Sequence, residues 1–269
     1  MFDLLLDPIR AEKKPWDLYL FALIFSVVAL VLSNFLFDKY LGFGSVVLLS
    51  FFFFPLLFRA FRHEEEVDAD LKCEGARMYA HRKIITLFVF IFLGCLTGYF
   101  FMFFLVDGEV RSSLFYDQIS TIESPSLATG NAIAAEAALI SILRSNFFLL
   151  GLCFFLSFIF GFGGLLLLLW NSSVFGIAIA LFIQKGLYAT SMLVPLAFIR
   201  YLLHGLPEVV SFFMASLGGS ILSFAVLRHD LRGEHGKSIF QDGLTLTTAS
   251  VLLLILSALI EVFLTPYFF

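Results

Sequence analysis

Apolar stretches about as long as a lipid bilayer is thick constrain this chain more than any other feature. A helix needs about 20 apolar residues to cross about 30 Å of hydrocarbon, and backbone polar groups inside lipid must be satisfied within the helix itself. The sequence therefore predicts an all-α polytopic integral membrane helix bundle with about seven transmembrane helices, in a range of six to eight. The expected spans are 16–37, 41–58, 84–106, 147–169, a short fifth span ending near 184, 206–227 and 244–263.

Composition excludes an ordinary soluble enzyme. The chain of 269 residues is 60% hydrophobic and only 14% charged, whereas a soluble domain carries about 25% charged residues. No basic stripe combines with exposed aromatic residues, so we expect no nucleic-acid partner. The three cysteines form neither a disulfide framework nor a CxxC metal pair, and we expect no cofactor.

Charge and apolar runs divide a single membrane domain, residues 1–269, into segments. Residues 188–203 are apolar but too short to span comfortably, are interrupted by Pro195 and carry Arg200, so we expect a re-entrant or interfacial helix there. The other expected segments are an interfacial helix at 1–15, a helical hairpin at 16–58, a charged cytosolic helix at 59–83, the third span at 84–106, an outer loop with an amphipathic helix at 107–145, and a helical core at 146–269.

Lysine and arginine concentrate in cytoplasmic loops of membrane proteins, so their distribution predicts orientation. With seven spans and a cytoplasmic N-terminus, twelve of the 17 basic residues lie inside and five outside. We therefore expect a multi-pass cell-membrane protein with its N-terminus in the cytoplasm and its C-terminus outside. The outer five are Lys39, Arg111, Arg144, Lys185 and Arg200.

Glycines at helical spacing predict close helix packing. Gly94 and Gly98 form a GxxxG pair, which lets a neighbouring backbone approach. The other glycines that we expect to pack helices together are Gly161, Gly163, Gly164, Gly176, Gly205, Gly218 and Gly219.

Four polar residues stand where lipid disfavours them. His204 and Glu208 are four residues apart at the start of the sixth span and share one helix face. Glu261 lies near the outer end of the last span, and Asn146 precedes the fourth. Because ionisable groups in lipid usually face other helices, we expect these four to converge in one intramembrane cluster.

The cluster has three interpretations. A structural clasp that fixes helix register is the one we favour. A proton or transport site is the second, and a metal site built from His204, Glu208 and Glu261 is the third. A lone HxxxE is a weak metal motif because it lacks the second histidine of HExxH.

Two secondary residues have simpler explanations. Asn171, expected at the junction of the fourth and fifth spans, is predicted to cap the following helix, with a lining role as the alternative. Arg200 is expected either to extend to the outer headgroups or to pair with Glu208.

The second half of the chain, roughly residues 140–269, resembles the stage II sporulation protein M family. The likeness rests on Asn146 before a glycine-rich span, Trp170-Asn171 with Gly176, His204-Gly205-x-x-Glu208 opening a span that contains Gly218-Gly219, and Glu261 with Pro266. The resemblance implies a polytopic membrane protein without established catalytic activity. The sporulation member of the family belongs to a membrane complex that localises cell-wall-degrading enzymes, and relatives occur in organisms that do not sporulate.

These observations predict a non-enzymatic scaffold or assembly factor of a membrane complex. Its expected partners are the lipid bilayer, other membrane or membrane-associated proteins and a second copy in a homodimer. The alternative is a transporter or channel that uses the His/Glu cluster for a proton, metal or small solute, and an intramembrane metalloenzyme is a third hypothesis.

Overall fold

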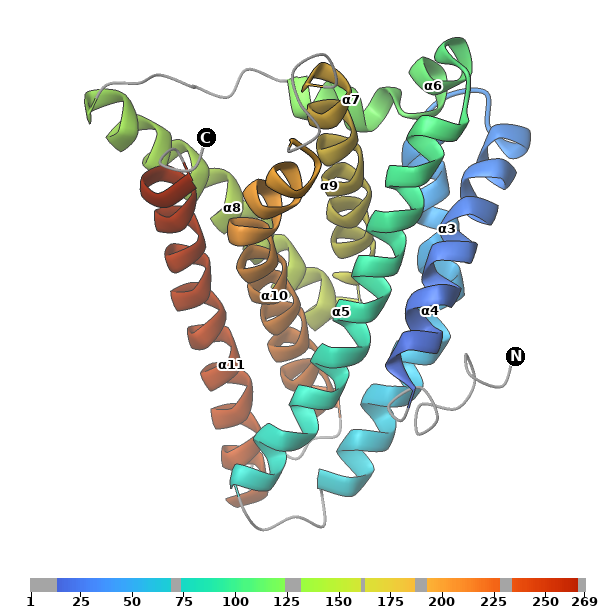
Figure 1. Cartoon of the computed structure of the whole chain (residues 1–269). Helices are drawn as coiled ribbons and strands as arrows, with labels where there is room; N and C mark the ends of the chain where they lie inside the picture. Colours follow the sequence, from blue (N-terminus) through green and yellow to red (C-terminus); the bar gives the residue numbers. More distant parts are fainter. Residues whose placement is uncertain are drawn as a thin grey trace. The chain divides into compact units, whose positions relative to one another are not determined.

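The computed structural model describes residues 14–68, 74–123, 132–160, 163–186, 193–227 and 234–265. The expected interfacial helix at 1–15 thus lies almost wholly outside the described residues. The chain divides into two compact units, one formed by Met1–Ser120 with Leu169–Ile177 and the other by Thr121–Leu168 with Ala178–Phe269. Figure 1 shows the helices of both units.

Seven of the described helices are long and apolar enough to cross a membrane, which confirms the predicted all-α polytopic fold. Each has at least 20 residues in its candidate span. The spans are Pro15–Leu36, Leu41–Ala60, Ile85–Leu105, Ala135–Phe160, Leu165–Gln184, Leu203–Ser223 and Ile239–Leu264.

The first unit is built on helix α3 (Pro15–Leu36), which packs against α5 (Glu74–Leu105) and α4 (Leu41–Asp68) (Figure 1). Pro15 occupies the first turn of α3, where its missing N–H is not needed. A Cβ atom on Gly94 would overlap the backbone oxygen of Tyr19, so glycine in α5 is what permits the close approach to α3. Two short helices follow α5, namely α6 (Gly108–Leu114) and α7 (Tyr116–Glu123).

In the second unit, α10 packs against both α8 and α11. Figure 1 shows α10 and α11 side by side, with α8 crossing obliquely. Gly218 lies against Gly243 and Thr247 of α11, and its neighbour Gly219 lies against the backbone of Phe154 in α8. The helices of this unit are α8 (Ala132–Phe160), α10 (Leu193–Leu227), α11 (Glu234–Leu259) and the π-helical turn η2 (Ile260–Leu264). Helix α9 (Leu165–Gly186) is divided, because its residues Leu169–Ile177 belong to the first unit and its two ends to the second.

Three expected boundaries are wrong because polar interruptions were read as helix ends. The charged segment 59–83 is not a helix of its own, since its described parts prolong α4 and begin α5. The amphipathic helix expected in the outer loop is the N-terminal part of α8, which continues without a break to Phe160. From Leu193 onward, the expected re-entrant helix is the start of α10, which runs through Pro207.

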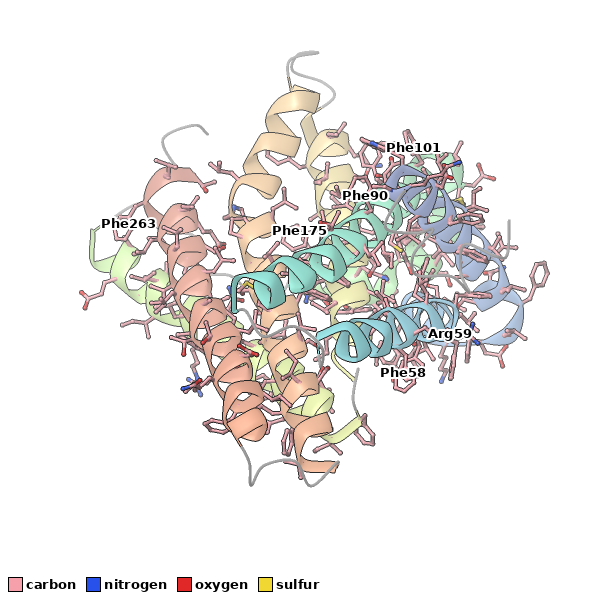
Figure 2. All side chains as sticks on the ribbon, turned by 90° about the horizontal axis from the view of Figure 1, so that it is seen from below. Phe58, Arg59, Phe90, Phe101, Phe175 and Phe263 are labelled. Carbon is pink, nitrogen blue, oxygen red and sulfur yellow. The ribbon has the colours of Figure 1, made fainter. Side chains whose placement is uncertain are left out.

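Large apolar side chains cover the outer faces of the helices, as a lipid environment requires. Along α3 they recur every three or four residues. Phe101 of α5 and Phe263 of η2 are each about half exposed, and Figure 2 shows where both side chains lie. The exposed stripe of α3 consists of Trp16, Leu20, Ile24, Val28, Val31 and Phe35.

Candidate functional site

The two glutamates predicted to converge lie on neighbouring elements of the second unit. Glu208 lies in α10 and Glu261 in η2, and these two elements pack against each other. Both side chains are partly buried. Ionisable residues within spanning helices usually face other helices, partners or water.

A π-helical turn presents Glu261. η2 contains five residues, Ile260–Leu264, and continues directly from α11. π-helical turns are rare and occur frequently at functional sites. The turn therefore distinguishes the backbone around Glu261 from the regular helix of α11.

His204 is 9% exposed and lies on the part of α10 that packs against α11. Its backbone oxygen accepts a hydrogen bond of 2.6 Å from the hydroxyl group of Ser257 in α11. The histidine position is thus fixed to the neighbouring helix through its main chain, one helical turn before Glu208.

The structure places Asn146 partly buried on α8. Among the described residues, no hydrogen bond joins its side chain to His204, Glu208 or Glu261. No three histidine, cysteine, aspartate or glutamate side chains in the described part of the chain are grouped so that they could hold a metal ion. Helix α10 thus carries His204 and Glu208 one turn apart, and it packs against η2, which carries Glu261.

The two secondary residues lie inside helices. Asn171 is the seventh residue of α9, so the prediction that it caps a following helix is wrong. The turn falls instead at Gly163 and Gly164, before α9. Arg200 lies in α10, but its side chain is outside the described set, as is Gly161.

The turn between α8 and α9 takes part in a buried contact. The hydroxyl groups of Ser157 in α8 and Ser216 in α10 are hydrogen-bonded, and the backbone N–H of Gly164 donates to the Ser157 oxygen at 3.0 Å. A Cβ atom on Gly164 would overlap the Ser216 hydroxyl. These small residues therefore connect α8, α10 and the turn through polar contacts, and Gly163 and Gly164 lie in that turn rather than inside the fourth span. Of the remaining predicted packing glycines, Gly205 is buried in α10, and Gly176 of α9 lies against the Leu96 backbone oxygen of α5.

A second polar group, in the first unit, has no counterpart among the predicted site residues. Gln118 of α7 is fully buried against Gly42 of α4, and its Nε2 donates to the Ser173 hydroxyl of α9 at 3.2 Å. The next residue back, Asp117, accepts a hydrogen bond from the Phe43 N–H at the start of α4.

This group continues into the bundle. The hydroxyl group of Ser45 donates to the Gly42 carbonyl at 2.7 Å and lies 2.6 Å from the Tyr99 hydroxyl. Since the serine proton is already used, Tyr99 is the donor to Ser45. The sequence offered little indication of this group. Gln118 falls in the segment expected to be an outer loop, and Ser173 follows Asn171 at the expected junction of the fourth and fifth spans.

Comparison with known protein families finds one match that extends from α5 to the end of the last span. The profile described as Stage II sporulation protein M matches residues 83–266, which is most of the chain. This chain belongs to the stage II sporulation protein M family. No curated protein and no solved structure matches the sequence of this chain significantly.

The family match begins earlier than the resemblance predicted. It includes α5 from residue 83 onward, α6 and α7, which the resemblance did not cover, as well as residues 140–266. The buried polar groups of both units therefore have members within the matched region, including Tyr99, Gln118, Glu208 and Glu261. Together with the seven apolar helices, the match establishes a multi-pass membrane protein.

Proposed function

We propose that this protein is a non-catalytic membrane scaffold whose role is to hold partner proteins in the membrane. The proposal rests on the observation that buried polar groups form hydrogen bonds between helices. Ser257 bonds the His204 backbone, Ser157 bonds Ser216, and Gln118 bonds Ser173. Polar groups that are already hydrogen-bonded to a neighbouring helix are not free to bind a passing solute, so they favour a rigid scaffold over a transport path.

A second function is favoured by one specific observation. Glu208 of α10 and Glu261 of the π-helical turn η2 lie on elements that pack together, and two carboxyl groups within a membrane have the chemistry of a proton-binding site. The rival proposal is a transporter that couples movement of a solute to protonation of this pair.

Reconstitution into liposomes distinguishes the two functions. For a scaffold, we expect vesicles containing the protein to show the same proton leak as empty vesicles under an imposed pH gradient. Glu208→Gln should leave thermal stability in detergent near that of the wild type, because it removes charge repulsion and keeps the shape of the side chain. His204→Ala should lower stability by about 1–3 kcal/mol, since it empties a buried site.

Glu109→Gln in α6 provides the control, because this glutamate is exposed and lies outside the spans. Proton flux in wild-type vesicles that disappears in Glu208→Gln at unchanged stability, but persists in Glu109→Gln, would refute the scaffold and support the transporter.

We also propose that the N-terminus is cytoplasmic and the C-terminus outside. The charge bias across the spans supports this orientation. A cysteine introduced at Lys39, which is exposed between α3 and α4, is expected to react with an impermeant maleimide added outside intact cells. A cysteine at Glu65 should react only after permeabilisation, in a Cys73→Ser background. Labelling of the Glu65 position from outside would reverse the orientation.

A further inference from the structure

Only one end of the Gln118 amide group has a hydrogen-bond partner. Gln118 of α7 is fully buried, and its Nε2 donates to the Ser173 hydroxyl group of α9 at 3.2 Å. Its Oε1 is also buried and receives no hydrogen bond from any residue that the structure describes. Buried polar atoms are almost always hydrogen-bonded, either to protein or to ordered water. This oxygen therefore indicates a donor that the described residues do not supply.

The orientation of this amide group follows from Ser173. The Ser173 hydroxyl group donates its one proton to the Trp170 backbone oxygen at 2.8 Å, so it can only accept a hydrogen bond from Gln118. The NH₂ end of the amide therefore faces Ser173, because the opposite orientation would place two oxygen atoms together. The amide oxygen lies over Gly42 at the start of α4, where a Cβ atom would overlap it.

The first turn of α4 has an N–H group in need of an acceptor beside this oxygen. The first N–H groups of a helix have no partner within the helix itself. In α4, the Phe43 N–H donates to the Asp117 carboxylate at 3.1 Å, and the Gly44 N–H donates to the Tyr40 carbonyl at 2.7 Å. For the Gly42 N–H, the described part of the chain supplies no acceptor. A buried acceptor and an N–H donor without partners thus lie at the same residue of α4.

We infer that one water molecule binds here and bridges α7 to α4, donating to Gln118 Oε1 and accepting from the Gly42 N–H. An anion offers no donor to Oε1, and the Asp117 carboxylate at the same helix end repels it. A cation accepts no hydrogen bond from an N–H group and is disfavoured at the positive end of a helix. Water is the small neutral molecule that both donates and accepts, and buried waters commonly satisfy unpaired polar groups in this way.

The water is a structural part of the contact between α7 and α4. Residue 42 has no side chain, so polar groups can approach its backbone closely. Removing the water leaves two buried polar groups unpaired at once, which is unfavourable. Gly42 and Gln118 both belong to the first unit, whereas Glu208 and Glu261 belong to the second, so the site is independent of whether the protein is a scaffold or a transporter.

Water-edited solid-state NMR on ¹⁵N-glycine-labelled protein in liposomes of deuterated lipid tests the site. Magnetisation that starts on water should reach the Gly42 N–H at short mixing times, although residue 42 is buried. Gly94, buried within α5, is the matched dry control, and exposed Gly108 at the start of α6 is the wet control. A Gly42 signal that builds up no faster than that of Gly94 would overturn the bound water.

Gln118→Met then separates a bound water from bulk water. This change removes the amide oxygen at nearly constant side-chain size, so the Gly42 signal should fall to the level of Gly94. The same change at Gln241, which is exposed on α11, should leave the Gly42 signal as in the wild type. An unchanged Gly42 signal in Gln118→Met protein that remains folded by thermal scanning would show that bulk water reaches α4, which contradicts the proposal.

A high-resolution cryo-EM map of the wild-type protein gives a measurement that needs no variant. We expect a separate density within hydrogen-bond distance of both Gln118 Oε1 and the Gly42 nitrogen. A map in which protein or lipid atoms fill that position, or in which the amide oxygen accepts a hydrogen bond from the chain, would rule the water out.

Discussion

Gly219→Ala is expected to lower the thermal stability of the protein in detergent strongly. The added methyl group would overlap the backbone oxygen of Phe154, which belongs to α8 and cannot move without shifting the helix. Overpacking of this kind costs about 1–3 kcal/mol, and more where backbone must move. We expect the melting temperature to fall by several degrees, as measured by scanning fluorimetry in a mild detergent.

Gly151→Ala is the matched control for this change. Gly151 lies in α8 itself, and its added methyl group would meet no atom within 4 Å. Alanine is the better helix former by about 0.5–1 kcal/mol, so the control should be neutral or slightly stabilising. Equal melting temperatures for the two variants would show that α8 and α10 do not need the close approach at Gly219.

Phe115→Ala is expected to loosen the segment that contains α6 and α7. Phe115 is fully buried between these helices, and its ring centroid lies 6.4 Å from that of Tyr99 and 5.9 Å from that of Phe103. Removing a buried phenylalanine costs about 3–5 kcal/mol. Hydrogen exchange should therefore become faster in α6 and α7, and the melting temperature should fall.

The neighbouring residue gives the control for this prediction. Tyr116 is 67% exposed, and an exposed substitution away from special features usually changes stability by less than about 0.5 kcal/mol. Tyr116→Ala should therefore exchange like the wild type. If both variants exchange at the wild-type rate, Phe115 does not anchor the segment.

The spans could be predicted from the sequence because lipid imposes a length on each helix. Seven apolar runs predicted seven spanning helices, and the structure contains them. The ends of the helices were harder to predict. A polar break in the sequence, formed by Arg144, Ser145 and Asn146, does not interrupt α8. A helix satisfies its own backbone hydrogen bonds, so polar side chains that remain on its surface do not end it.

Some of the buried polar residues could also be found from the sequence, and others could not. Glu208 and Glu261 could be singled out from the sequence because each is an ionisable residue inside an apolar run, and the structure places them on elements that pack together, α10 and η2. Gln118 could not be predicted, because its burial depends on contacts with Gly42 and Ser173, which lie far away in sequence. A glutamine among polar and apolar neighbours has no local sequence pattern that indicates such a contact.

Helix α9 has a consequence for how the protein is made. Its residues Leu169–Ile177 belong to the first unit, where the Ser172 hydroxyl donates to the Phe92 backbone oxygen at 2.8 Å and Gly176 lies against Leu96. The three earlier spans are therefore synthesised before the segment that completes their unit. A nascent chain stopped before Leu169 would lack these contacts, so the first unit can reach its full set of helix contacts only after the fifth span has been made.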